Sequence, residues 1–378
     1  MKQILAPLTR GFDRKAITTI VLSATLTAGA CYHQDKVSVG SFTNYLSHYG
    51  FDDLNKRRAL ENLMRRADII KPLESLASHF PPRHNSASLM FDILKFVKDT
   101  QEKFTVRSGT QERWDVKAAD WTVEHRDANF DDLKTLGFID EIKPKNKNPD
   151  AICVLGAVYS RIENRLNYVE NLVKDGVLPA NLVFLVGERP VTVNIDGSME
   201  DLEKIASKYN IDSLKKLTET HMAKEVYQKS ALYNRFPTTI LDTPAGDLPR
   251  PTTQTTVLEL IGWLKQNPNV KNLVFVTNQP YVKYQQAVID NVFRNANFKI
   301  DFEVVGSAEA SKENGHLIVE ALGSFVWAAT PNLLLTINKQ VNNSEAIKMA
   351  EELYKKQPLV YKEIEKLFDT SKSSTRSI

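Results

Sequence analysis

A glycine followed by two arginines is the first set of residues whose types and spacing suggest a function. Gly156 lets the backbone come close to a ligand, and Arg161 and Arg165 lie four residues apart, on one face of a predicted helix. Guanidinium groups beside the free amides of a helix amino terminus suit an anion such as a phosphate. The segment has no GxGxxG or Walker pattern, so a solvent-exposed pair of arginines is an equally good interpretation.

Later apolar runs of the chain, which are predicted strands, also end at small or polar residues. A glutamate lies on a predicted helix between two of these strands. Further ligand-binding positions are predicted at Gly187, Glu219, Asp242, Thr253, Asn278 and Tyr281. The polar groups near Asn278 suit a sugar or nucleotide hydroxyl. The threonine also fits a simple helix cap, and the glutamate also fits a salt bridge to Lys215 or Lys216 on a solvent-exposed face.

No conventional catalytic or metal-binding set is present in the sequence. The seven histidines have no HExxH or other metal-ligand spacing, and there is no GxSxG nucleophile motif. His221 fits a surface or helix-capping role, and Cys153 lies inside an apolar run, where a structural role is favoured over that of a nucleophile. The sequence therefore predicts no metal, and it identifies neither a catalytic residue nor a cofactor.

Short apolar runs alternate with amphipathic segments after residue 149, and these elements must position the candidate residues. The predicted strands are 151–155, 181–186, 238–241, 272–277 and 300–305. The predicted helices are 161–174, 212–232, 255–266 and 282–296. Strands that are apolar on both faces and separated by helices indicate a mostly parallel sheet, hence a Rossmann-like three-layer α/β sandwich. Its ligand crevice lies at the carboxyl ends of the strands, where we expect Glu219, Asp242 and Arg161 in one cleft.

The composition is that of a globular protein and excludes several classes. The chain has 378 residues, of which 42% are hydrophobic and 25% charged, and these values exclude collagen-like and wholly disordered chains. The two cysteines are too few for a disulfide scaffold. The formal net charge of +3 is too close to balance for nucleic acid to be the main partner.

The chain divides into four predicted parts. They are an export signal or membrane anchor at 1–30, a helical accessory region with a linker at 31–148, the Rossmann-like domain at 149–330 and a helical tail at 331–378. The accessory region has apolar residues at helical spacing between 41 and 104. Its lysine-rich end, 143–149, fits a solvated linker.

A basic segment followed by an uncharged one marks the amino terminus as an export signal. Lys15 precedes the uncharged residues 16–30, which are too few for a typical membrane span. The small residues Ala28 and Ala30 suit signal peptidase, and cleavage after them makes Cys31 the first residue, open to lipidation. The lipoprotein signal prefers leucine where Ala28 stands. An uncleaved signal anchor and a buried amphipathic helix of a cytosolic protein are the alternatives.

The candidate residues stand in an order that is known from one bacterial family. The order along this chain is Asp150–Gly156, Arg161, Arg165, Gly187, Glu219, Met222, Asp242, Thr253, Val274–Thr277 and Glu320–Gly323. This order spans about residues 150–325 and resembles the SanA/ElyC/YdcF-like domain family, whose function is poorly defined. The resemblance implies an envelope-associated protein, in agreement with residues 1–31. One family member is linked to a nucleotide-like cofactor.

Two departures from the family concern its reactive side chains. The family's histidine and arginine after the Val-Thr strand fall at about Tyr281 and Tyr284 in this chain, and its asparagine falls at about Thr256. The resemblance therefore implies the fold and a ligand site more strongly than it implies catalysis.

Two functions are predicted from these observations. The first is an exported or membrane-tethered protein of the bacterial cell envelope, periplasmic or held to the membrane through its amino terminus, that binds a phosphorylated or nucleotide-like small molecule through the candidate residues. The alternative is a non-catalytic interaction protein, secreted or held in the envelope. Its contacts are made by the helical region 41–104 and the charged tail 341–378.

Overall fold

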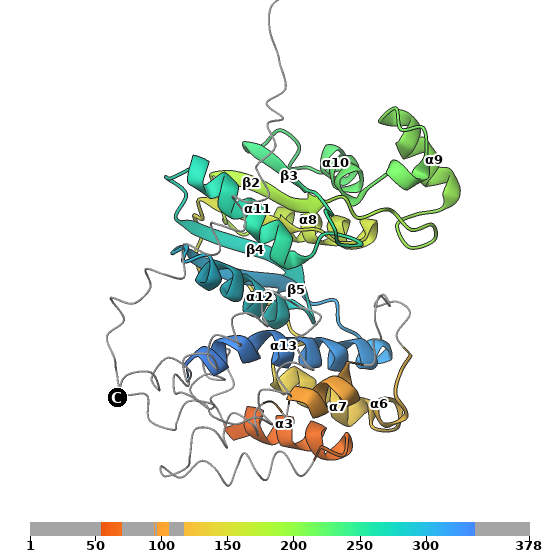
Figure 1. The fold of residues 1–378 in the computed structure, drawn as a ribbon, viewed down its shortest axis with the longest axis vertical. Coiled ribbons are helices and arrows are strands. Elements are labelled where there is room, and N and C mark those ends of the chain that lie inside the picture. Colours follow the sequence, from red (N-terminus) through yellow and green to blue (C-terminus); the bar gives the residue numbers. More distant parts are fainter. Residues whose placement is uncertain (1–53, 70–93, 95–96, 106–116, 337–378) are drawn as a thin grey trace, which may run out of the picture.

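The structure is a computed structural model that describes residues 54–69, 94, 97–105 and 117–336 (Figure 1). The predicted export signal, with Cys31, and the predicted tail contacts at 341–378 lie outside these residues. Within the described ranges, no helix is both long enough and apolar enough to cross a membrane.

Five parallel strands form one sheet, as the alternating sequence pattern predicts. They are β1 Ala151–Leu155, β2 Asn181–Gly187, β3 Thr238–Thr243, β4 Asn272–Asn278 and β5 Asp301–Ser307. Their order across the sheet is β3-β2-β1-β4-β5, so the central β1 pairs with β2 on one side and with β4 on the other. The Rossmann-like α/β fold is confirmed.

Helices cover both faces of this sheet, which explains why its central strands are apolar throughout. The covering helices are α8 Tyr159–Lys174, α10 Glu219–Lys229, α11 Thr253–Gln266 and α12 Val282–Asn295. In β1, Ile152 and Val154 join a buried cluster with α8 and α10, whereas Cys153 joins the opposite cluster with α11 and α12. The chain leaves β1 toward one face and leaves the neighbouring β4 toward the other. A crevice opens between their carboxyl ends for this reason.

Cys153 is a structural residue, as the sequence predicts. Its side chain is completely buried in the middle of β1. Burial raises the pKa of the Cys153 thiol far above its ordinary value, so the reactive thiolate is suppressed.

The connection between β2 and β3 differs from the prediction. The sequence predicts one helix over 212–232, whereas the structure has α9 Met199–Lys208, a 3₁₀ turn Leu214–Lys216 and then α10, which begins at Glu219. The break arises because Thr218 caps α10 and pairs with His221, whose Nδ1 accepts the Thr218 amide at 3.2 Å. The predicted capping role of His221 is confirmed.

Helices from both ends of the described chain build a further layer, drawn in the lower half of Figure 1. These helices are α3 Leu54–Arg66, α6 Asp120–Glu124, α7 Arg126–Thr135 and α13 Gly315–Thr336, joined by the helical residues 97–104. Their shared core includes Phe104, Phe138 and Phe325. α13 packs along α12 on its other side, so it joins this layer to the α/β unit.

The lysine side chains of the linker 143–149 are exposed to solvent, whereas its backbone is held by hydrogen bonds to the sheet. Lys143, Lys145 and Lys147 are exposed. The amides of Lys145 and Asn146 each donate to the Glu303 carboxylate at 2.9 Å, which ties the linker to β5. The linker therefore enters the sheet in one defined position.

Candidate functional site

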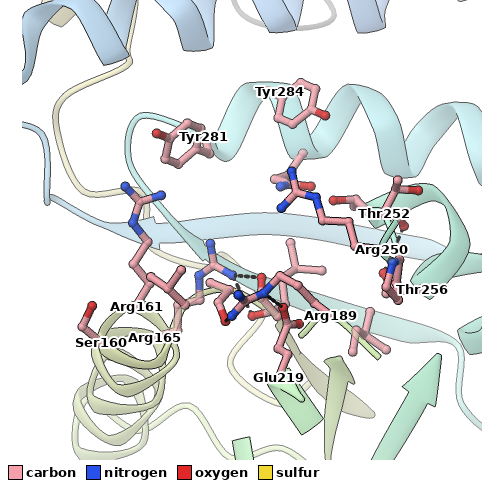
Figure 2. Close-up of a pocket in the computed structure, with 18 of the residues that line it drawn as sticks. Ser160, Arg161, Arg165, Arg189, Glu219, Arg250, Thr252, Thr256, Tyr281 and Tyr284 are labelled. Atoms are coloured by element: carbon pink, nitrogen blue, oxygen red, sulfur yellow. Dashed lines mark hydrogen bonds and ion pairs between the residues drawn. The ribbon is translucent and has the colours of Figure 1, made fainter. Parts of the chain in front are cut away.

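A pocket of about 420 Å³ opens at the carboxyl ends of the central strands (Figure 2). Its walls are the turn after β1 and the first turns of α8, α10, α11 and α12, completed by Leu317 of α13. An open parallel sheet binds ligands at this edge, and small-molecule sites have volumes of roughly 300–1,000 Å³. The predicted ligand-binding residues that line the pocket are Gly156, Arg161, Arg165, Glu219, Thr253 and Tyr281.

Arg189, which follows β2, is the centre of a buried ion-pair network in the pocket wall. Its Nη atoms donate to Asp196 at 3.0 and 2.7 Å, and its Nε donates to Glu219 Oε2 at 2.8 Å. Further bonds reach the carbonyls of Pro190 and Ala157. Burial lowers the pKa of Arg189, but its hydrogen bonds and charge interactions with the two carboxylates outweigh burial and raise it overall. Arg189 is thus a fixed cation whose five N–H groups are all engaged.

Asp196 anchors this network to the backbone around it. Its side chain is fully buried, and it accepts the amide of Thr192 at 2.8 Å and the amide of Tyr159 at 3.1 Å. Because Tyr159 is the first residue of α8, Asp196 links the segment after β2 to the start of that helix.

Glu219 turns one carboxylate oxygen toward the pocket. Its Oε2 is bound by Arg189, whereas its Oε1 lies against Gly156, where a Cβ atom would overlap with it. No residue in the described part of the chain donates a hydrogen bond to this Oε1. Burial raises the pKa of Glu219, while the positive charges of Arg189 and Arg165 act against this rise without cancelling it.

Arg165 is buried and joins the ends of β1 and β4. Its Nη1 donates to the carbonyls of Leu155 and Gly156, both at 2.7 Å, and its Nε and Nη2 donate to Asn278 Oδ1 at 3.1 and 2.8 Å. Burial, together with the nearby charge of Arg161, lowers the pKa of Arg165 to about 10, so the side chain is cationic at neutral pH. The interpretation as a solvent-exposed pair is therefore wrong for Arg165. Its main role in the pocket is to shape the wall and to supply positive charge.

The turn after β1 offers unpaired backbone donors. The amides of Ala157, Val158 and Ser160 donate no hydrogen bond to any residue within the described ranges, and all three residues line the pocket. Arg161 is the next residue of α8, and its side chain extends across the pocket mouth toward Tyr281, with the guanidinium carbon 5.2 Å from the centre of that ring (Figure 2). Open amides, the positive end of a helix dipole and a guanidinium together favour an anion. We call residues 157, 158, 160 and 161 the anion corner.

The start of α11 contributes another wall. Thr252 caps this helix, because its Oγ1 accepts the Thr255 amide at 3.3 Å, and the next residue, Thr253, lines the pocket. Arg250 lies in the same segment and is half-buried. Among the residues that line the pocket, four are arginines and a single one, Glu219, is acidic. The pocket therefore carries an excess of positive charge.

The side of the pocket opposite Glu219 is formed by α12 and α13. Figure 2 shows Tyr281 and Tyr284 there, across the pocket from the glutamate. Gln285 also lines this side and is only 8% exposed, and its Oε1 is buried without a hydrogen-bond partner among the described residues. Its Nε2 has no partner in those residues either. A buried amide without partners is a group that a ligand can satisfy.

Three of the predicted residues do not line the pocket. Asp242 lies on the edge strand β3 and accepts the hydroxyl of Thr220 at 2.5 Å. Gly187 is packed where a Cβ atom would overlap the backbone of β3. Asn278 is buried and orients Arg165. The structure therefore brings Glu219 and the start of α8 together, as expected, but leaves Asp242 outside their pocket.

Sequence reasoning missed the network below the pocket. The alternative salt bridge of Glu219 to Lys215 or Lys216 is wrong, because Glu219 pairs with Arg189. The sequence signal for Arg189 is its place three residues after the predicted strand 181–186. Asp196 lies in an irregular segment whose sequence has no periodic pattern to mark it.

Within the described residues, no group of three or more His, Cys, Asp or Glu side chains is placed to hold a metal ion. The arginines and open amides are suited to an anionic ligand instead. A scan against protein-family models, a search of curated proteins and a search of solved structures each found no match to the chain.

Proposed function

We propose that this protein binds a phosphorylated small molecule, with a phosphate group at the anion corner and the rest of the ligand toward Tyr281 and Tyr284. The observation that carries the proposal is the anion corner itself, three unpaired amides beside Arg161. The first amides of a helix have no partner within the helix, and here they line the pocket, where ligand oxygens can accept their hydrogen bonds.

Charge, volume and the opposite wall support the same ligand class. Arg161 and Arg250 both line the pocket and add positive charge. The side-chain amide of Gln285 lines the pocket without a partner among the described residues, so a polar group of the ligand can bind it. A volume of about 420 Å³ suits a phosphate joined to a sugar or a nucleoside, and tyrosine rings can stack on such a group.

The sequence predicts that the protein binds its ligand in the bacterial cell envelope. The export signal at residues 1–30 and the lipidation of Cys31 are predictions outside the described residues. With the resemblance to the SanA/ElyC/YdcF-like family, they favour a periplasmic or membrane-tethered protein that binds a phosphorylated or nucleotide-like envelope precursor. The alternative interaction function depends on 41–104 and 341–378, whereas the pocket favours a small-molecule ligand.

A thermal-shift series tests the proposal. The ligands are inorganic phosphate, diphosphate, nucleotides, sugar phosphates and polyprenyl phosphate, each added to the wild-type protein. At least one is expected to stabilise it by mass action. The substitution Arg161→Ala is expected to weaken the binding of that ligand about tenfold, which corresponds to about 1.4 kcal/mol.

Lys174→Ala is the matched control, because it removes an exposed cation at the far end of the same helix. It is expected to leave the affinity unchanged. Arg165 is unsuitable for this test, since its substitution also removes bonds that hold β1 to β4. No stabilisation by any of these ligands, or equal effects of the two variants, would contradict the proposal.

A further inference from the structure

Glu219 has one carboxyl oxygen that the fold does not use. Arg189 holds Oε2, and because every N–H group of Arg189 is engaged, the carboxyl group is fixed in direction. The other oxygen faces Gly156, next to the turn that carries the anion corner. A rigidly held acid with a free oxygen therefore lies beside the place where we put the phosphate.

The protonation state of this oxygen decides what it can do there. An ionised carboxylate only accepts hydrogen bonds and repels a phosphate, whereas a neutral carboxyl group donates a proton to one of its oxygens. Burial raises the pKa of Glu219, the nearby charge of Asp196 adds to this rise, and Arg189 and Arg165 act against it. The net shift is upward, which favours the neutral acid relative to an exposed glutamate.

We propose that Glu219 is a catalytic residue, a general acid that donates its Oε1 proton to the ester oxygen of a phosphate monoester held at the anion corner. The inference rests on the proposed function, since the phosphate must first bind there. The oxygen of a water molecule forms a bond to phosphorus while the bond from phosphorus to the ester oxygen breaks. The electron pair of that bond stays on the ester oxygen, which takes the Glu219 proton. The products are an alcohol and phosphate, and the proton lost by the attacking water restores the acid.

The surroundings of Glu219 suit this step. Charge on the transferred phosphoryl group is stabilised by the open amides and by Arg161, which are already in place before the reaction. Tyr281 and Tyr284 lie on the opposite wall, where the alcohol part of the ester fits. Gly156 is required because any larger residue would push the acid away from the phosphate.

Phosphate release from three esters tests the role of Glu219. The probes are p-nitrophenyl phosphate, phenyl phosphate and glycerol phosphate, whose leaving groups need a proton to increasing degrees. Glu219→Gln keeps the size of the side chain, and its carbonyl still accepts the Arg189 bond. The variant is expected to lose about 10²–10⁴-fold in kcat/KM with glycerol phosphate and much less with p-nitrophenyl phosphate. Wild-type kcat/KM is expected to fall as pH rises through the pKa of Glu219, and the variant is expected to lack this fall.

The outcomes separate this inference from the proposed function. Inorganic phosphate is expected to bind Glu219→Gln as tightly as the wild type or more tightly, and Lys174→Ala is expected to keep full activity. An equal loss with all three esters, or equal rates in variant and wild type, overturns the catalytic role. Binding of inorganic phosphate without release from any ester overturns it too, while the proposed function stands. If the wild type binds neither inorganic phosphate nor any of the phosphorylated ligands of the thermal-shift series, both fail.

Discussion

Glu219 Oε1 lies so close to the Cα of Gly156 that no side chain fits at position 156. The start of α10 is thereby pressed against the end of β1, two elements more than 60 residues apart in the sequence. The carbonyl of Leu185 in β2 closes the same space from another side, at 2.9 Å from a Cβ at this position. The acid and the glycine therefore depend on each other.

Gly156→Ala is expected to destabilise the protein by about 1–3 kcal/mol, because the new methyl group overlaps Glu219 and the backbone of β2. Urea unfolding measures this change. The control is Gly262→Ala in the interior of α11, where nothing lies within 4 Å of a new Cβ. That substitution is expected to stabilise by about 0.5–1 kcal/mol, since alanine is the better helix former. Equal effects of the two substitutions would argue against the contact.

Asp196→Ala is expected to cost about 3–5 kcal/mol of stability, because it leaves the buried Arg189 cation without its main partner. It also removes the acceptor of the Tyr159 and Thr192 amides. Thermal and urea unfolding measure the loss. Asp212→Ala breaks an exposed ion pair to Lys216 and is expected to leave the unfolding midpoint unchanged. A mild effect at Asp196, comparable to that control, would show that the network is not a structural support of the pocket.

Asn278→Ala is expected to destabilise by about 1–3 kcal/mol, because the Nε and Nη2 groups of the buried Arg165 lose their acceptor. The guanidinium is then held only through its Nη1 bonds to the carbonyls of Leu155 and Gly156, so the affinity for inorganic phosphate is expected to change in the same variant. Unfolding and phosphate titration are measured side by side. If the variant is as stable as the wild type and binds phosphate equally well, Asn278 does not position Arg165.

The free energy of unfolding is expected to depend on pH through Glu219. Its folded pKa is raised above the ordinary value of 4.5, so the folded state keeps a proton that the unfolded state loses. The stability from this proton is fully present below the unfolded pKa and is lost as pH rises through the folded pKa. The stability of Glu219→Gln relative to the wild type is therefore expected to increase as pH rises above the ordinary glutamate pKa and through the raised folded pKa. A difference that is constant over this range would mean that the pKa of Glu219 is not raised.

The fold could be predicted from the sequence because the central strands of its sheet are apolar on both faces. β1 is apolar throughout and β4 contains the apolar run 273–276, and the predicted bounds of both strands differ from the observed ones by at most one residue. The connection between β2 and β3 was not predictable in the same way. Helix α9 has a short amphipathic pattern between irregular segments, and the cap at Thr218 divides what reads as one long helix.

The site was only partly predictable, since its residues are set by position in the sheet rather than by a motif. Arg161 and Glu219 reach the pocket because α8 follows the central strand and α10 packs beside α8. Asp242 does not, because β3 is the edge strand and its carboxyl end lies away from the crevice beside β1. Pairing of Arg189 with Asp196 depends on a loop conformation that no spacing rule describes.

Because Leu317 of α13 lines the pocket, a shortened chain must keep α13 in place. This pocket residue belongs to α13, whose Phe325 packs edge-on against Phe138 with ring centres 6.2 Å apart. A fragment that starts at residue 149 keeps all five strands and all four pocket arginines. It loses Phe138 and the other N-terminal partners of α13, and it exposes that helix's apolar side to water. Studies of ligand binding therefore require the N-terminal helices as well as the sheet.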